Sequence, residues 1–508
     1  MNAFSFRRPR LVVVGNGMAG VRTLEEILER LPGGFDITVF GAEPHGNYNR
    51  IMLSPVLAGE KRFEDIVTHG RGWYESRGIE LIAGEAVTAI DRAGRIVTGE
   101  HGAQRSYDVL LLATGSHSVV LPVSGASLPG VIGFRDIADV ETMLEACRRG
   151  GRAVVIGGGL LGLEAAHGLA RNGMEVSVVH LMPTLMERQL DPVSGGLLAA
   201  DLQARGITVL TSANTQAILG EAHVRAVELA NGQKLAANLV VMAVGIRPNI
   251  ALAREAGLAC GRGIQVDDAM RTSDPAIFAV GECAEHRGQV FGLVDPLWDM
   301  ARICADRITG AAESTYEPGI TGTRLKVTGI EMFSAGELLG DEGTEEVMFR
   351  DLARGIHKRL VLRGDRLIGA ILYGDARDSA WYFDLIRSGI DISAIRDVLI
   401  FGPAIAGTDG AGEAVDALPD SVEICGCNGV SKDFILAAIA EHELTTLEEV
   451  RARTKASASC GSCTCEVEAL LAKATDDAYF SAPGVKPLGG CTSHGHDVVP
   501  CRGQCGAV

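Results

Sequence analysis

Long apolar runs and an excess of positive charge are both missing from this sequence. No stretch approaches the roughly 18 apolar residues that a membrane span needs, and the opening residues lack the apolar region and cleavage site of a secretory signal. The net charge is −17, whereas nucleic acids and anionic membranes favour basic surfaces. These absences predict a cytoplasmic protein that binds neither nucleic acid nor membrane.

Cysteine, in contrast, is plentiful. The 508 residues include 12 cysteines, in a composition (47% hydrophobic, 22% charged) that is ordinary for globular proteins. The length suffices for about three or four domains. Because the cytosol keeps thiols reduced, we expect these cysteines to be ligands or free thiols rather than disulfides. Metal or redox chemistry is therefore the leading expectation.

A glycine-rich segment occurs twice. Residues 10–28 (RLVVVGNGMAGVRTLEEIL) match residues 152–170 (RAVVIGGGLLGLEAAHGLA), and a second strand-like stretch follows each copy. Each copy is typical of the strand, turn, helix and strand that open a doubly wound parallel sheet. Its glycines let the backbone approach a pyrophosphate at a helix N-terminus, where the helix dipole favours anions. These glycines are Gly15, Gly17 and Gly20 in the first copy and Gly157, Gly159 and Gly162 in the second.

Further strand ends complete the pattern and set the expected domains. Residues 107–116 (YDVLLLATGS) and 235–249 (LAANLVVMAVGIRPN) resemble each other, which adds Gly245 to the nucleotide-contacting positions, and residues 274–286 form another buried strand that ends at Gly281 and Glu282. The predicted fold is α/β, with two dinucleotide-binding (Rossmann-like) units, an α+β domain and a small helical module. The expected divisions are 1–118 with 250–317, 119–249, 318–405 (α+β), a linker at 406–421, a cysteine module at 422–475 and a flexible tail at 476–508.

Polar residues that could contact ribose or nicotinamide follow the glycine turns. Glu43 is the carboxylate nearest the end of the first unit's second strand. His180 holds the corresponding position in the second unit, where neither an acid for a ribose 2′-hydroxyl nor an arginine for a 2′-phosphate stands. We therefore expect weak discrimination between NADH and NADPH. Glu164, two residues beyond Gly162, is either a partner of the helix dipole or a group beside the nicotinamide.

Four cysteines near the C-terminal end are regularly spaced. Cys425 and Cys427 are one residue apart, and Cys460 and Cys463 follow after 32 residues that read as two short helices joined by a turn. Thiolates are the usual ligands of [2Fe–2S] centres; tetrahedral zinc is the structural alternative, but zinc has no redox role. Four further thiols form either a second centre or, as we favour, a surplus: Cys465, Cys491, Cys501 and Cys505.

Several segments together resemble a known family. They are VFGAEPHGNYNRIMLSPVLAG, ATGS, VVHLMPTLMERQLD, AVGECAEHRG, CGCNGVSK and TKASASCGSC. They make residues 1 to about 475 similar to the N-terminal part of bacterial NAD(P)H-dependent nitrite reductase large subunits and to electron-transfer subunits of assimilatory nitrate reductases. The resemblance implies a flavoprotein with FAD in the first unit and NAD(P)H in the second, NADH being favoured. It also implies a [2Fe–2S] module like the bacterioferritin-associated ferredoxin.

The same resemblance implies roles for particular residues. Arg50 would approach the isoalloxazine, Thr114 and Gly115 would contact FAD, Glu282 would contact the ribitol, and Glu164 would lie beside the nicotinamide. Many relatives have Asp where this sequence has Glu282. Arg50 and Glu164 are thus the candidate catalytic residues. No cysteine occurs in the first 140 residues, so a flavin–disulfide relay is not expected and electrons must leave the flavin by another route.

The expected function is that of an FAD-dependent NAD(P)H oxidoreductase that passes electrons through the cluster. By resemblance, the acceptor is a molybdenum-containing catalytic subunit of cytoplasmic nitrate reductase. The nitrite reductases continue into a sirohaem and [4Fe–4S] domain that this sequence does not reach, so we do not expect a complete nitrite reductase. Two alternatives stay open: a stand-alone reductase of a rubredoxin, ferredoxin or nitric-oxide-related partner, and a redox-sensing regulator that uses the thiols.

Overall fold

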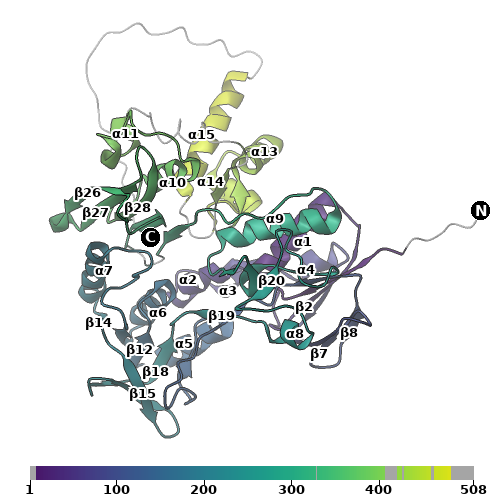
Figure 1. The fold of residues 1–508 in the computed structure, drawn as a ribbon, viewed down its shortest axis with the longest axis horizontal. Coiled ribbons are helices and arrows are strands. Elements are labelled where there is room, and N and C mark those ends of the chain that lie inside the picture. The colour runs from purple at the N-terminus through teal and green to yellow at the C-terminus, as the bar shows by residue number, and fades with distance from the viewer. Residues whose placement is uncertain are drawn as a thin grey trace, which may run out of the picture.

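The computed structural model describes residues 7–325, 327, 329–406, 420, 422–425, 428–458 and 463–481. Two parallel sheets are followed by an antiparallel sheet and then by a small module of helices (Figure 1). The linker predicted at 406–421 and the tail predicted at 476–508 lie mostly outside the described residues.

The first parallel sheet has the strand order β21-β9-β1-β2-β5. Its strands are β1 (Arg10–Val14), β2 (Asp36–Gly41), β5 (Glu80–Ala83), β9 (Val109–Leu112) and β21 (Ile277–Ala279). Leu11 and Val13 of β1 are buried in one core with helices α1 (Met18–Arg30) and α9 (Asp295–Thr309). Such apolar strands are typical of parallel sheets that are covered on both faces. Strand β21 joins the sheet after the whole second sheet has intervened, so the chain leaves this unit and returns to it.

The second parallel sheet repeats this plan in the order β11-β18-β12-β13-β14. Its elements are β11 (Val131–Ile132), β12 (Arg152–Ile156), β13 (Glu175–Val179), β14 (Thr208–Leu210) and β18 (Leu239–Met242), with helices α5 (Ile137–Arg149), α6 (Leu160–Arg171) and α7 (Pro192–Ala204). Helix α6 connects the parallel strands β12 and β13, just as α1 connects the parallel strands β1 and β2. The repeat seen in the sequence is therefore a repeat of structure.

Antiparallel strands accompany and join these units. Each unit carries a three-stranded sheet: β6 (Val87–Asp91), β7 (Ile96–Gly99) and β8 (Gln104–Ser106) in the first, and β15 (Thr215–Gly220), β16 (Val224–Leu229) and β17 (Lys234–Ala236) in the second. Strand β10 (Ser116–Ser118) pairs with β19 (Ile246–Pro248) and ties one unit to the other. The short elements are β3 (Asn47–Tyr48), β4 (Val67–His69), β20 (Ile264–Val266), β22 (Ala284–His286), β23 (Gln289–Val290), α2 (Leu53–Leu57), α3 (Phe63–Ile66), α4 (Arg71–Glu75) and α8 (Ala251–Glu255).

The third sheet is antiparallel, in the order β24-β25-β28-β27-β26. Its elements are β24 (Gly322–Arg324), β25 (Met332–Gly336), β26 (Glu345–Asp351), β27 (Ile356–Leu362), β28 (Leu367–Tyr373), α10 (Ser379–Ser388) and α11 (Pro403–Ala406). Leu57 of α2, Leu163 of α6 and Met332 of β25 belong to one buried cluster. This sheet is thus packed against both nucleotide-type units.

The last region is a small helical module. It contains β29 (Glu423–Cys425), β30 (Val430–Ser431), α13 (Lys432–His442), α14 (Leu447–Thr454) and α15 (Thr464–Ser481). Helices α13 and α14 are the two short helices that the sequence predicts between the cysteine pairs. In Figure 1 the module lies beside α9, at the top of the molecule.

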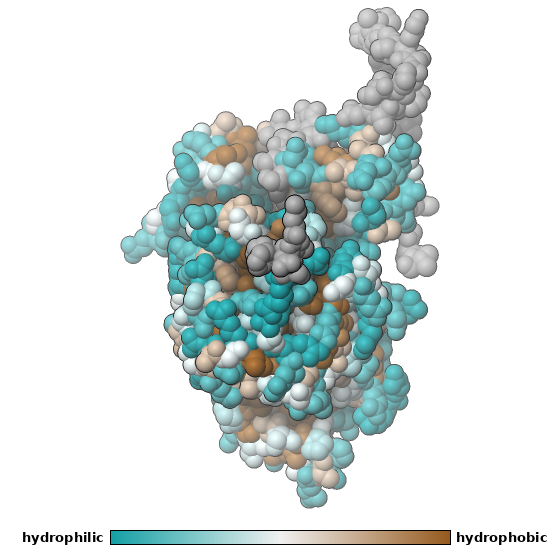
Figure 2. Space-filling model, turned by 90° about the vertical axis from the view of Figure 1, so that its right-hand side faces the viewer, coloured by the Kyte–Doolittle hydropathy of each residue, from teal (hydrophilic) through white to brown (hydrophobic). Residues whose placement is uncertain are grey.

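The face of the molecule shown in Figure 2 is largely hydrophilic, with separate apolar patches. Within the described part of the chain, none of the helices combines the length and the apolar character that a bilayer crossing requires.

Candidate active site

Close backbone contacts explain the first glycine of each turn. Gly15 has φ +112° and Gly157 has φ +120°. A Cβ on Gly15 would lie 2.1 Å from the carbonyl oxygen of Ala113, and one on Gly157 would lie 2.2 Å from that of Ala243. Each turn therefore passes directly over the end of a neighbouring strand, which a larger residue would prevent.

The last glycine of each turn serves helix packing. A Cβ on Gly20 would lie 2.6 Å from the oxygen of Gly15, and one on Gly162 would lie 2.1 Å from that of Gly157. Gly281 is similar, since a Cβ there would lie 2.9 Å from the Cβ of Ala19. These three glycines are absent from the cavity lining, and each allows a close approach that a side chain would prevent; their predicted contact with a cofactor stays a prediction.

The middle glycines leave open space at two helix N-termini. Gly17 and Gly159 are the N-caps of α1 and α6, and no side chain caps either helix. A Cβ on either glycine would meet nothing within 4 Å, and both glycines line the same cavity. Uncapped backbone N–H groups facing an open cavity fit the pyrophosphate of a dinucleotide.

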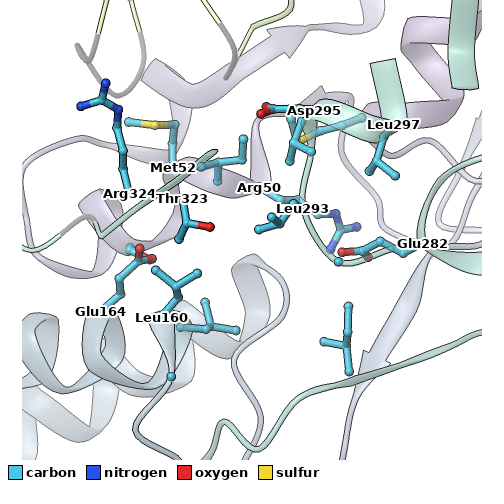
Figure 3. A pocket seen from close by; sticks show the side chains of 18 of the residues that line it. Arg50, Met52, Leu160, Glu164, Glu282, Leu293, Asp295, Leu297, Thr323 and Arg324 are labelled. Carbon is cyan, nitrogen blue, oxygen red and sulfur yellow. The ribbon is translucent and has the colours of Figure 1, made fainter. Parts of the chain in front are cut away.

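One large cavity, of about 2500 Å³, is lined by residues of both nucleotide-type units. Figure 3 shows part of it, with Glu164 of α6 and Glu282 on opposite sides and Leu293 between them. It brings together most of the residues predicted from the sequence: Gly15, Gly17, Glu43, Arg50, Thr114, Gly115, Gly157, Gly159, Glu164, His180, Gly245, Glu282, Cys425 and Cys463. Their roles stay predictions, but their gathering around one cavity is a feature of the fold.

Glu43 and Arg50 form an ion pair in the first unit. Glu43 Oε2 also accepts a hydrogen bond of 2.6 Å from the Tyr48 hydroxyl, and burial raises the pKa of Tyr48, so that this hydroxyl stays a donor. Arg50 Nη1 donates to the carbonyl of Arg135 at 3.2 Å. Glu43 thus orients Arg50, a contact that the sequence did not suggest.

Glu282 follows β21 in a short 3-10 turn, Gly281–Cys283. Its Oε2 accepts a hydrogen bond of 2.8 Å from Ser116 Oγ and pairs with the guanidinium of Arg135. Sequence reasoning missed Ser116 and Arg135, although Ser116 stands directly after the ATG segment. Together the three side chains form a polar corner of the cavity.

Thr114 and Asn249 tie the two strand ends together. Thr114 Oγ1 donates to the carbonyl of Asn249 at 2.8 Å, and Asn249 Nδ2 donates to the carbonyl of Thr114 at 2.8 Å. Gly115 has φ +64° and Gly245 has φ +112°. The resemblance between these two segments in the sequence therefore corresponds to a direct contact in the fold.

Glu164 is only 6% exposed. Its Oε2 accepts a hydrogen bond from Ser54 Oγ of α2. Ser54 lies 110 positions away in the sequence, which is why sequence reasoning missed it. The contact holds a carboxylate at the cavity wall between the two units.

His180 follows β13 and is anchored on both ring nitrogens. Its Nδ1 is 3.0 Å from the backbone nitrogen of Gly158, and its Nε2 is 3.0 Å from Glu187 Oε2. A carboxylate is therefore present beside this position, although the sequence pattern showed none there. Glu187 was missed because it belongs to the loop after the strand.

Two of the four predicted cluster ligands lie in the described residues. Cys425 is 0% and Cys463 is 5% exposed, and both belong to the module's own apolar cluster. Cys427, Cys460, Cys491, Cys501 and Cys505 lie outside the described residues, as does the side chain of Cys465. Over the described ranges, potential metal ligands do not gather in groups of three or more. Two buried thiols that line the same cavity fit half of a four-thiolate site.

The turn after Cys425 connects the module to the first unit. Asn428 Nδ2 lies 3.7 Å from Cys425 Sγ, while Asn428 Oδ1 accepts a hydrogen bond of 3.1 Å from Asn49 Nδ2. A Cβ on Gly429 would lie 3.2 Å from the Trp298 indole of α9. Asn49 directly precedes Arg50, so the module contacts the segment that carries a candidate catalytic residue.

Similarity to known proteins agrees with this geometry. Residues 9–301 match the pyridine nucleotide-disulphide oxidoreductase family, residues 322–390 the rubredoxin NAD+ reductase C-terminal domain, and residues 423–473 the BFD-like [2Fe-2S] binding domain. The chain is 44% identical over 493 residues to a nitrite reductase [NAD(P)H] of Bacillus subtilis (strain 168), covering 97% of this chain and 61% of that protein. It is 41% identical over 491 residues to the assimilatory nitrate reductase electron transfer subunit of the same organism, covering 97% and 63%.

A solved structure shows the same fold. The ferredoxin reductase for the CYP199A2 system from Rhodopseudomonas palustris has a TM-score of 0.69 and 28% identity, covering 77% of this chain and 98% of that one. The chain spans about three fifths of the length of the two Bacillus relatives. The predicted two-dinucleotide-binding fold, the [2Fe–2S] module and the resemblance are confirmed: this chain belongs to the pyridine nucleotide-disulphide oxidoreductase family.

Proposed function

We propose that this protein oxidises NAD(P)H with FAD and passes the electrons through a [2Fe–2S] cluster to a nitrate reductase catalytic subunit. The observation that carries the proposal is the single cavity that both glycine turns line and that reaches Cys425 and Cys463. A Bacillus subtilis relative that matches 97% of this chain is an assimilatory nitrate reductase electron transfer subunit. By the sequence resemblance, the catalytic subunit contains molybdenum and acts in the cytoplasm.

In this proposal the two units hold different nucleotides. Residues 1–118 with 250–317 bind FAD, through the N–H groups at Gly15 and Gly17 and the polar corner around Glu282. Residues 119–249 bind NAD(P)H at Gly157 and Gly159. Residues 422–475 hold the cluster on Cys425, Cys427, Cys460 and Cys463. When bound, FAD accepts hydride and releases electrons singly, which metal acceptors require.

The side chains of this protein orient the reactants and limit water. Glu43 and Tyr48 fix Arg50 at the cavity, where its positive charge favours electron-rich groups. Glu164, held by Ser54, faces the nicotinamide end of the second unit. Leu160, Leu293 and Leu297 provide apolar wall (Figure 3). Such a wall strengthens every polar contact inside by excluding water.

A second candidate function is that of a stand-alone reductase for a small redox protein. The observation that favours it is the match of residues 322–390 to the rubredoxin NAD+ reductase C-terminal domain. Both candidates share the hydride-accepting site and differ in the acceptor. Comparing nitrate reductase with rubredoxin as acceptor therefore separates them.

Anaerobic titration of the purified holoprotein tests the proposal. FAD takes two electrons and a [2Fe–2S] centre takes one, so full reduction should consume about 1.5 NADH per chain. Iron analysis should give about two irons per chain. Zinc in place of iron, or a flavin that NADH and NADPH both fail to reduce, would contradict the proposal.

A further inference from the structure

We propose that Glu187 selects NADH over NADPH by accepting the ribose 2′-hydroxyl, and that His180 is its positioning residue. This inference rests on the proposed binding of NAD(P)H in the second unit. It replaces the weak discrimination that the sequence predicts from His180 alone.

The hydrogen-bonding roles of the two His180 ring nitrogens follow from their neighbours. The Gly158 N–H can only donate, so His180 Nδ1 accepts at 3.0 Å. Nε2 is then the nitrogen that carries a proton, and it donates to Glu187 Oε2 at 3.0 Å. The His180 side chain is 10% exposed and that of Glu187 is 31% exposed. The Glu187 carboxylate is thus held by His180 through Oε2 and is partly exposed.

The loop that carries Glu187 is fixed to the same glycine turn. The Met186 N–H donates to the carbonyl of Gly158 at 3.0 Å, so Gly158 contacts the loop through both its N–H and its carbonyl. Met186 and Leu185 are each 0% exposed. Met186 also has φ +51°, a left-handed conformation that a non-glycine residue adopts only when its surroundings impose it. Glu187 is therefore part of a rigid structure.

The position of Glu187 matches the chemistry of the ribose. In a unit of this kind, an acid near the end of the second strand binds the ribose 2′-hydroxyl. Glu187 lies seven residues after His180 in the sequence, and it lines the cavity together with Gly157 and Gly159. A hydroxyl can donate to this carboxylate, whereas a 2′-phosphate would bring like charges together. Arg188 also lines the cavity, and it is the residue that would hold a 2′-phosphate if the site were built for NADPH instead.

The test compares NADH with NADPH in the full-length holoprotein, using a dye acceptor. Wild type should prefer NADH by more than about a hundredfold in kcat/KM. Glu187→Gln keeps the shape of the side chain but removes its charge. It should lower the ratio of kcat/KM for NADH over NADPH at least about tenfold, mainly by raising the KM for NADH. His180→Gln should act in the same direction, with little further effect in the double variant, because the two residues act as a unit.

Arg188→Gln is the matched control, since it changes the adjacent charge on the same cavity wall. It should not lower the use of NADPH. Calorimetric titration with NAD+ and NADP+ gives a second readout that does not depend on turnover, and Glu187→Gln should weaken NAD+ binding selectively. A wild-type preference for NADPH, an unchanged ratio in Glu187→Gln, or a loss of NADPH use in Arg188→Gln would overturn the inference. If neither nicotinamide reduced the wild-type flavin, the proposed function itself would fail.

Discussion

The nucleotide-binding units and the cysteine module are attached to the rest of the protein in different ways. The two units share a cavity wall, and a buried cluster joins the second unit and α2 to the antiparallel sheet. The module has an apolar cluster made only of its own residues, and it meets the first unit through contacts such as Asn49 with Asn428 and Lys61 with Ala458. This difference teaches that, under the proposed function, hydride would be accepted in the main body and the electrons would leave through a separable unit.

Removing a proposed ligand of the [2Fe–2S] cluster should have the largest effect on this comparison. Cys425→Ser should abolish iron binding, because a serine hydroxyl replaces a thiolate ligand. FAD should stay bound, since Cys425 belongs to the apolar core of the module and not to the cores of the nucleotide-binding units. Iron analysis and the flavin absorption spectrum measure both outcomes. Simultaneous loss of flavin would show that module and main body are not separable.

Substitution of the first glycine should damage the main body instead. Gly15→Ala places a Cβ 2.1 Å from the Ala113 carbonyl oxygen at φ +112°, and should cost about 3 kcal/mol in the free energy of unfolding. Gly17→Ala is the matched control, because its Cβ meets nothing within 4 Å in the fold. It should keep the melting temperature of the apoprotein while weakening FAD binding. Equal melting temperatures for the two variants would contradict the close-approach argument.

The contact between the second unit and the antiparallel sheet should contribute less to stability at acidic pH. Burial alone would raise the pKa of Asp191, but hydrogen bonds from His357 and Ser194 lower it to about 2. A carboxyl whose pKa is lowered on folding stabilises the fold above its unfolded pKa of about 4, and this stabilisation is lost as the pH falls towards 2. Asp191→Asn should therefore be less stable at pH 7, by about 1–3 kcal/mol, and the gap to wild type should close between pH 4 and 2. Thermal melts across this range measure the gap; a gap that is independent of pH would contradict the assignment.

The smallest expected effect lies in the contact between module and main body. Asn428→Ala removes a donor 3.7 Å from Cys425 Sγ and the acceptor for Asn49. Because hydrogen bonds to the sulfurs influence cluster potentials, the reduction potential should become more negative. Lys61→Gln is the control, since it removes a contact to Ala458 of the module without touching a cysteine. The reduction potential measured by redox titration should shift in Asn428→Ala and stay unchanged in Lys61→Gln.

Backbone features of the site were predictable from the sequence, whereas its side-chain pairs were not. Gly15 and Gly157 stand in a local pattern, because a turn between strand and helix involves adjacent residues. The partners that orient the site come from distant segments: Ser54 reaches Glu164 from α2, and Asn49 reaches Asn428 from another domain. Glu187 is close in sequence to His180, but only the fold of the buried Met186 turn shows that the two meet.

The route of electrons is tested most directly by removing the module. A chain ending at about residue 415 keeps the apolar cores of the main body, because the residues of the module form an apolar core of their own. The truncated protein should still be reduced by NADH and should pass electrons to small dyes, but it should fail to support NADH-dependent nitrate reduction by the purified catalytic subunit. Nitrate reduction at the rate of the full chain would show that the cysteine module is structural and that electrons leave the flavin directly.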